Sequence, residues 1–285
     1  MSAANEANGG KQIVAGSPLR RCAIHVEAAF RLLLKPPRIR APAWPFTLRQ
    51  TAIAGGVGVA IFLVLMVFVD AAEVRAVGRL PRWVPWFFDQ ITDYGKSGWF
   101  LWPLGVLFLA LAALDQARLT RLSQAVLAAA MVRVGFLFLA IGVPGLFVAI
   151  VKRMIGRARP LVGGSLDPYL FAPFIWRADY ASLPSGHTTT AFSVLVAFGT
   201  LWPRARTALW IYALAILDSR LAVTAHYPSD VLAGAVVGTV GSLMVRRYFA
   251  LRRLGFSVGP DGVPHQYPGP SLRRIKAVAR ELLAP

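Results

Sequence analysis

The stretch Ser219–Asp230 holds side chains that could attack and bind a phosphate, and it lies between two apolar runs. Such side chains are costly against lipid, so they should face a protein interior or a wet cavity. Pro228 suits the first turn of a helix, so we expect His226 to close one helix and Asp230 to open the next. The carboxylate can then reach one ring nitrogen of His226, which leaves the other free to attack an electrophile.

Arg220, earlier in the same stretch, supplies a planar cation suited to a phosphate. The stretch is equally compatible with an ordinary helix end that buries an Arg–Asp pair. Ser219 is interpreted as a structural partner of these residues, and the role of Asp218 stays open.

A second candidate stretch is Lys152–Pro160, at the end of a long apolar run. Lys152 and Arg159 are two helical turns apart, so a helix that continues to Pro160 would project both from one face. The alternative is a juxtamembrane basic cluster that holds lipid headgroups. Arg153 and Arg157 lie outside the spacing, and we interpret them as surface contacts of that kind, with a place in the site as the alternative.

A third stretch, Pro184–His187, opens another apolar run. Gly186 permits close approach of the backbone, and the N–H groups at a helix start bind anions. Taken alone, Ser185 is an N-cap and His187 an interfacial histidine.

The elements that position these stretches are membrane helices. Hydrophobic residues make up 56% of the 285 residues and the mean hydropathy is +0.56, which predicts an all-α polytopic membrane protein. We expect a basic segment at 1–50, a six-helix membrane domain at 51–249 and a basic tail at 250–285. The predicted spans are Thr51–Val69, Gly98–Leu114, Ala125–Val151, His187–Trp202, Thr207–Ala225 and Val231–Phe249. We interpret Asp70–Ser97 as an interfacial loop rich in aromatic residues.

Net charge is +18, with 31 basic and 13 acidic residues. Nucleic acid is a common partner of such a chain, but the charges flank the apolar segments, which favours membrane orientation and anionic headgroups instead. Basic residues at both ends predict that both termini are cytoplasmic, in a bacterial inner membrane. Residues 20–34 could form a surface helix or a floppy tail, and the C-terminal tail could lie along the membrane or be disordered. Cys22 is the single cysteine, so no intrachain disulfide is possible.

The topology brings the three stretches together at the outer ends of the third, fourth and fifth spans. The connecting segment 152–183 also has an excess of bases on the side where the positive-inside rule disfavours them, and an anionic ligand explains that excess. Three cations around a histidine describe a phosphoryl pocket, and they disfavour a metal at His187, His226 and Asp230.

The three stretches together resemble the signature K-x6-RP, PSGH, SR-x5-H-x3-D of the type 2 phosphatidic acid phosphatase (PAP2) superfamily, in its membrane branch. The resemblance covers about Thr51–Phe249 and implies a site facing outward near the bilayer surface. It further implies that His226 attacks phosphorus to form a phosphohistidine, that Asp230 orients His226, and that His187 is the general acid and base. The phosphate-binding groups would be Lys152, Arg159, Arg220, Ser185 and Gly186.

The cations take the place of Mg²⁺, so we expect no metal or other cofactor. Because the site lies at the membrane edge, the expected substrate is a lipid phosphate: phosphatidic acid, phosphatidylglycerol phosphate, undecaprenyl diphosphate or a lipid A phosphate. The segment Ile91–Trp99 is similar to one in some bacterial lipid phosphatases of this superfamily. Transfer to a second lipid, hydrolysis of a soluble ester and non-enzymatic lipid binding remain alternatives. We expect no nucleic acid and no obligatory protein partner.

Overall fold

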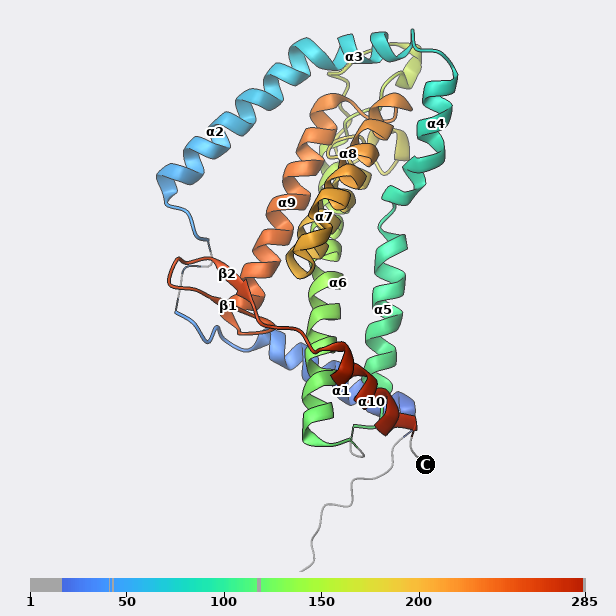
Figure 1. Ribbon diagram of the computed structural model, residues 1–285. Coiled ribbons are helices and arrows are strands. Elements are labelled where there is room, and N and C mark those ends of the chain that lie inside the picture. The colour runs from blue at the N-terminus through green and yellow to red at the C-terminus, as the bar shows by residue number, and fades with distance from the viewer. Residues whose placement is uncertain (1–16, 41, 43, 117–118, 284–285) are drawn as a thin grey trace, which may run out of the picture.

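The computed structural model describes residues 17–40, 42, 44–116 and 119–283. Its centre is a bundle of long helices that run side by side (Figure 1). These helices are α5 (Gly98–Ala113), α6 (Arg121–Ile155), α7 (Gly186–Leu201), α8 (Arg206–Ala222) and α9 (Pro228–Leu251). Each coincides with a predicted span to within a few residues, because each is a continuous apolar run between polar or proline-containing turns.

The main apolar core lies where α6, α7 and α9 meet, and side chains of α5 pack against it. The ring of Phe136 in α6 packs edge-on against Phe249 of α9 and Phe256 just beyond it, with ring centroids 5.6 and 4.8 Å apart. Burial of such rings is a large apolar contribution to stability, with about 1 kcal/mol more from the ring pairing. This core lies below the polar residues and holds the helices that carry them in one orientation.

Two glycines bring α9 unusually close to α7. A Cβ added at Gly234 would lie 2.5 Å from the carbonyl oxygen of Ser185, and one at Gly238 would lie 2.4 Å from that of Thr189. A larger residue would therefore force the helices apart. The approach places the starts of α7 and α9 together, and Ser185 N donates a 3.0 Å hydrogen bond to the carbonyl of Asp230.

The first predicted span is longer than expected. Helix α2 (Leu48–Val64) continues through a π-helical turn (Leu65–Val69) into α3 (Asp70–Val77). Within the described chain no residue of α2 is buried, and this helix slants away from the bundle while α3 crosses its upper end (Figure 1). The π-helical turn thus returns the chain to the bundle at Asp70.

The expectation of a loop over Asp70–Ser97 was wrong, because most of this segment is helical. After α3, helix α4 (Trp83–Thr92) begins just beyond Pro81, and a short turn (Asp93–Gly95) joins it to α5. The aromatic residues that were interpreted as an interfacial loop lie on α4, where an N-terminal proline and a run of apolar residues favour a helix.

Four of the described helical stretches are long and apolar enough to cross a bilayer: Leu48–Val77, Trp83–Ala113, Arg121–Ile155 and Pro228–Leu251. Helices α7 and α8, the predicted fourth and fifth spans, have 16 and 17 residues. A span needs about 20 residues, so α7 and α8 fall short of that length and the six-span count stays a prediction. The chain is nevertheless an all-α membrane protein.

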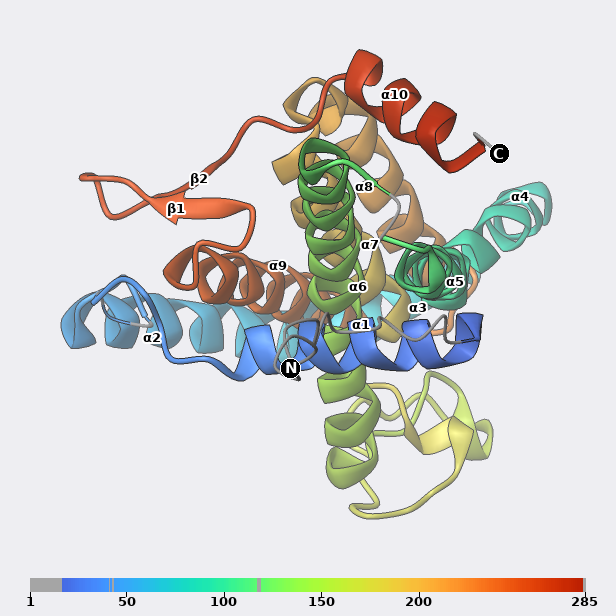
Figure 2. The ribbon, with the colours of Figure 1, turned by 90° about the horizontal axis from the view of Figure 1, so that it is seen from below.

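The described parts of both tails fold against the lower end of the bundle. Helix α1 (Pro18–Leu34) lies across the end of α5, where His25 Nδ1 is 2.5 Å from the carbonyl of Ala112. After α9 come a hairpin of β1 (Phe256–Val258) and β2 (Pro264–Gln266) and then helix α10 (Leu272–Leu283). Glu281 of α10 caps the start of α6 by accepting from Thr120 N and Ser123 Oγ. Figure 2 shows α1 and α10 on either side of this end.

Candidate active site

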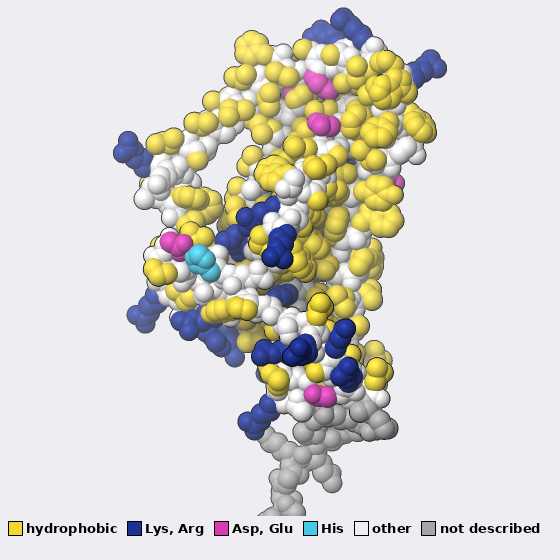
Figure 3. All heavy atoms as spheres, viewed as in Figure 1, with side chains coloured by type: hydrophobic (Ala, Val, Ile, Leu, Met, Phe, Trp, Pro, Cys, Tyr) yellow, Lys and Arg dark blue, Asp and Glu magenta, His cyan; other side chains and the backbone are white. Residues whose placement is uncertain are grey.

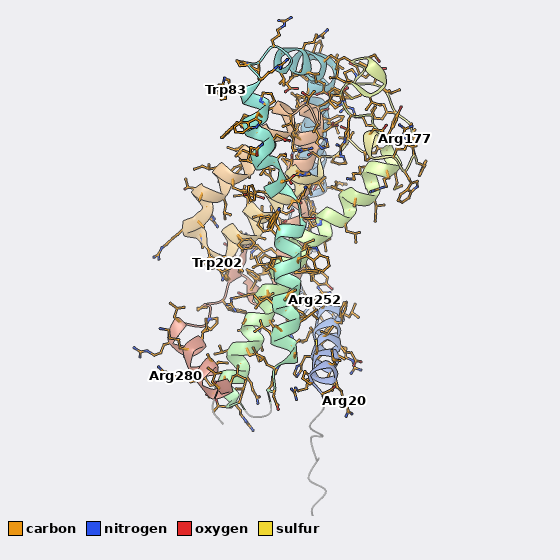
Figure 4. The ribbon with its side chains drawn as sticks, turned by 90° about the vertical axis from the view of Figure 1, so that its right-hand side faces the viewer. Arg20, Trp83, Arg177, Trp202, Arg252 and Arg280 are labelled. Carbon is orange, nitrogen blue, oxygen red and sulfur yellow. The ribbon has the colours of Figure 1, made fainter. Side chains whose placement is uncertain are left out.

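The three predicted stretches meet at the end of the bundle opposite the tails. Figure 4 places Arg177 and Trp83 at this end and Arg20 and Arg280 at the other. Helix α8 ends at Ala222 and α9 begins at Pro228, so His226 lies in the short loop between them and is 3% exposed. Asp230 stands in the first turn of α9, as predicted.

His226 and Asp230 face each other, but a hydroxyl group stands between them. Nδ1 of His226 is 3.8 Å from Oδ2 of Asp230, beyond hydrogen-bond range. Ser182 Oγ donates to that carboxylate oxygen at 2.6 Å and lies 3.4 Å from His226 Nδ1. With its proton on Asp230, the hydroxyl can accept from Nδ1–H, and this arrangement leaves Nε2 unprotonated.

The burial of His226 favours its neutral form. Burial lowers the pKa of His226 below its ordinary value of 6.5, and the carboxylate of Asp230 acts in the opposite direction. The positive charges of Arg220 and Arg159 lower it further. Both arginines therefore lie within electrostatic range of the imidazole.

The helical phasing predicted for Lys152 and Arg159 was wrong. Helix α6 ends at Ile155, because Gly156 adopts a left-handed conformation (φ 65°) where a Cβ would lie 1.9 Å from the carbonyl oxygen of Ala172. Beyond Gly156 the chain is extended, and Arg159 N donates to the carbonyl of Asp179 at 2.8 Å. Lys152 therefore lies on the last turn of α6, whereas Arg159 comes from the segment that follows.

Arg157 is not a surface contact, which corrects the expectation for this residue. Its backbone forms an isolated antiparallel bridge with Phe171. The Arg157 side chain has no exposed area and makes 2.7 Å ion pairs with Asp70 and Asp230. The guanidinium of Arg153 lies 5.4 Å from the ring centroid of the exposed Trp176, which is compatible with the surface position expected for Arg153.

Two arginines of the candidate site keep donors that the described residues leave unused. Arg220 donates a 2.5 Å hydrogen bond to Thr92 Oγ1, and Ser219 Oγ lies 3.1 Å from the same atom. The Nε atoms of Arg159 and Arg220 are buried and have no hydrogen-bond partner among the described residues. A buried, unpaired donor is costly, so an anion between these two cations would satisfy both.

His187 stands in the first turn of α7, next to the turn between α4 and α5. A Cβ added at Gly95 would lie 2.9 Å from His187 Cδ2, so only glycine allows this contact. His187 also lies within electrostatic range of Arg220, His226 and Lys96. The Ile91–Trp99 segment singled out in the sequence therefore packs directly against a predicted site residue.

Ser185 and Gly186 begin α7 as predicted, but their environments differ. Ser185 is fully buried, and its Oγ accepts a 3.1 Å hydrogen bond from Thr188. Gly186 is partly exposed at the helix start, where free N–H groups favour an anion. The backbone of this turn is therefore better placed for a phosphate than the Ser185 hydroxyl is.

Four residues of this region were missed by the sequence interpretation: Asp70, Thr92, Arg157 and Ser182. An acid that ends an apolar run is a signal of function in membrane proteins, and Asp70 carries that signal. Arg157 lies within Lys152–Pro160, one of the three candidate stretches in the sequence. Thr92 lies in the Ile91–Trp99 segment singled out in the sequence, whereas for Ser182 no signal in the sequence points to the contact.

Comparison with known proteins gives consistent results. Residues 133–254 match the model of the PAP2 superfamily. The chain is 36% identical to a lipid A 1-phosphatase of Rhizobium johnstonii, over 62% of this chain and 72% of that protein. It is 35% identical to the lipid A 1-phosphatase of Rhizobium etli, over 62% of this chain and 76% of the relative.

Two further similarities are more limited. The phosphatidylglycerophosphatase B of Escherichia coli is 39% identical, over 20% of this chain and 24% of its own length. The crystal structure of a transmembrane PAP2 type phosphatidylglycerolphosphate phosphatase from Bacillus subtilis also aligns with this chain. The alignment spans 67% of this chain and 92% of the Bacillus chain, with a TM-score of 0.46 and 20% identity. From the long Rhizobium matches and the family match, the protein belongs to the PAP2 superfamily and is a membrane-integral lipid phosphate phosphatase.

Proposed function

We propose that the protein hydrolyses the phosphate of a membrane lipid through a phosphohistidine on His226. The observation that carries the proposal is the pair of buried Nε donors of Arg159 and Arg220. They have no partner among the described residues, and both cations lie within electrostatic range of His226, whose burial favours the neutral form. Preorganised donors aimed at developing charge are the largest source of catalysis in phosphoryl transfer.

Each residue of the site then has a defined task in the reaction. His226 Nε2 attacks phosphorus, its Nδ1 proton is held by Ser182, and the negative charge of Asp230 stabilises the cationic imidazole of the intermediate. Arg159 and Arg220, with Lys152 and the N–H of Gly186, hold the phosphoryl oxygens. His187 donates a proton to the leaving oxygen and then takes one from the water that releases inorganic phosphate.

The leaving group is the lipid. His187 packs against Gly95, and a shallow pocket of about 480 Å³ beside it is lined by Asp93, Lys96, Gly98, Trp99, Trp102 and Pro103. Two tryptophans and a Lys–Asp pair suit the interfacial part of a lipid. We place the substrate's lipid portion on this side of the site.

Among lipid phosphates, we propose a lipid A type substrate first. The relatives that match most of their own length are lipid A 1-phosphatases, whereas the phosphatidylglycerophosphatase match spans a quarter of that protein. Phosphatidic acid, phosphatidylglycerol phosphate and undecaprenyl diphosphate are the comparison substrates.

We further propose that the site faces the exterior of the inner membrane. Most of the Lys and Arg side chains visible in Figure 3 gather around the lower end of the molecule, where α1, α10 and the hairpin lie. A basic end marks the cytoplasmic side, so the opposite end, which carries His226, faces outward.

The experiment is release of inorganic phosphate by purified protein from vesicles of each lipid, in the presence of EDTA. The proposal expects release that is metal-independent, greatest for lipid A and lost in His226→Ala. Release that survives His226→Ala would overturn the assignment of the nucleophile. Loss of substrate without inorganic phosphate, and with a newly phosphorylated second lipid, would establish transfer instead.

A further inference from the structure

Three buried charged residues, Asp70, Arg157 and Asp230, form a row that leads from the end of the first long apolar helix to His226. Arg157 stands between two carboxylates: its Nη2 donates to Asp70 Oδ2 and its Nη1 to Asp230 Oδ1, each at 2.7 Å. None of these three side chains has exposed area. Burying three charged groups is expensive unless all are paired and hydrogen-bonded, so the arrangement requires both acids.

Asp70 is tied to the helix that carries Asp230 as well as to Arg157. Its Oδ1 accepts from Ser229 N at 3.0 Å, and its Oδ2 accepts from Ser229 Oγ at 2.6 Å. The Ser229 hydroxyl in turn accepts from Arg157 Nη1 at 2.7 Å. Asp70 therefore caps the start of α9 and shares the guanidinium with Asp230.

Arg157 does not hold a phosphate in this arrangement. Its Nε donates to the carbonyl of Pro168 at 3.1 Å, its two other nitrogens are engaged by the acids, and its guanidinium lies 4.5 Å from the ring centroid of Tyr227. Fully enclosed, it differs from Arg159 and Arg220, whose Nε donors stay unpartnered among the described residues. Arg157 is thus a positioning residue.

The charges of the row explain why two acids are needed. Arg157 with Asp230 alone would be a neutral pair, and such a pair stabilises a cationic imidazole weakly. With Asp70 present, two carboxylates face one guanidinium, and the row has a net charge of −1. In a medium of low dielectric constant that residual charge acts strongly on a neighbouring cation.

We propose that Asp70, through Arg157, sets the strength with which Asp230 stabilises the cationic form of His226. The inference rests on the proposed function only in its catalytic consequence. Asp70 lies outside the residues that match the family model, so this helix contributes a part of the site that the matched region lacks.

Other charges around the row are accounted for. His226 is also within range of Arg220 and Arg159 and of His187. Asp70 is within range of Glu73, and Tyr227 within range of Arg157, Asp230, Asp70 and Asp167. A change of Asp70 to asparagine keeps the shape of the side chain and removes one charge, and it leaves all of these other side chains in the protein.

The test is the titration of His226 in Asp70→Asn, followed by NMR of the full-length protein with nitrogen-15-labelled histidine. The chain has four histidines, and His226→Gln assigns the signal. The midpoint should fall by about one pH unit, which corresponds to a tenfold weaker interaction. An unchanged midpoint in a folded variant overturns the proposal. Because this readout needs no substrate, failure of the proposed lipid phosphatase function leaves it intact.

Activity gives a second readout. In Asp70→Asn, kcat should fall roughly tenfold while KM stays within about twofold, because the phosphate-binding cations are untouched. The matched control is Glu73→Gln, an acid on the same helix that has no hydrogen bond to Arg157 within the described chain, and it should leave kcat unchanged. Equal losses in the two variants would mean a general effect of charge and contradict the proposal.

A double substitution distinguishes an effect that Asp70 exerts through Arg157 from a general loss of stability. Arg157→Gln leaves two buried carboxylates without a cation, so we expect little activity and low stability. Adding Asp70→Asn removes one of those carboxylates. The double variant should therefore have a kcat at least tenfold higher than that of Arg157→Gln alone. If the two effects on kcat simply multiply, Asp70 does not act through Arg157 and the proposal fails.

Discussion

Ser182 Oγ lies 2.6 Å from Asp230 Oδ2 and separates that carboxylate from His226. The pair of residues that the sequence predicts as partners is therefore joined through a third, whose backbone N–H donates to the carbonyl of Arg157 at 3.1 Å. The extended segment after Gly156 thus holds both Arg157 and the serine in place.

Ser182→Ala should lower kcat by roughly 10- to 100-fold, the usual cost of losing a group that orients a reacting residue. KM should change little, because the alanine leaves the cations in place. The check is steady-state kinetics beside Ser242→Ala, which removes an equally buried hydroxyl that donates to Ala140 in the core. A similar loss in both variants would assign the effect to packing.

Thr92→Val should raise KM several-fold with a smaller effect on kcat. The substitution removes the acceptor that holds Arg220 at 2.5 Å, so the guanidinium gains freedom that binding must remove, at a cost of roughly 1 kcal/mol. The matched control is Thr200→Val, which removes a hydroxyl bonded within α7, to the carbonyl of Val196. A kcat defect without a KM change would show that Thr92 acts elsewhere.

Gly95→Ala should impair the protonation of the leaving group. Its Cβ would press on His187 Cδ2 at 2.9 Å and on Ile216 at 2.7 Å, so the imidazole must move. Hydrolysis of a lipid phosphate should fall at least tenfold. The first-turnover release of phenol from a phenyl ester with a good leaving group needs no acid, so that release should be nearly normal. Gly145→Ala, where an added Cβ would have no described atom within 4 Å, is the control. Equal loss on both substrates would remove His187 from the role of acid.

Activity should persist below pH 6.5. Burial holds the pKa of His226 below 6.5, and a histidine is neutral and nucleophilic at any pH above its own pKa. The acid limb of kcat/KM therefore lies below 6.5. A profile measured on mixed micelles with a midpoint above 6.5 on the acid side would contradict the neutral nucleophile.

Much of this site follows from the sequence, because its residues lie at the ends of apolar runs that form neighbouring helices. His187, Arg220, His226 and Asp230 come together for that reason. The relation of Lys152 to Arg159 could not be predicted from periodicity, since one left-handed glycine, Gly156, ends the helix early. The contacts of Thr92 and Asp70 depend on how α3 and α4 cross the bundle, which local patterns do not encode.

The most direct test of the central claim is capture of the covalent intermediate. Protein mixed with lipid A labelled with radioactive phosphorus is quenched in alkali, where a phosphohistidine survives, and the label is located by peptide mapping. The account predicts label on His226, absent in His226→Ala and lost on acid treatment. Label on another residue, or turnover of the wild-type protein without any labelled protein, would contradict it.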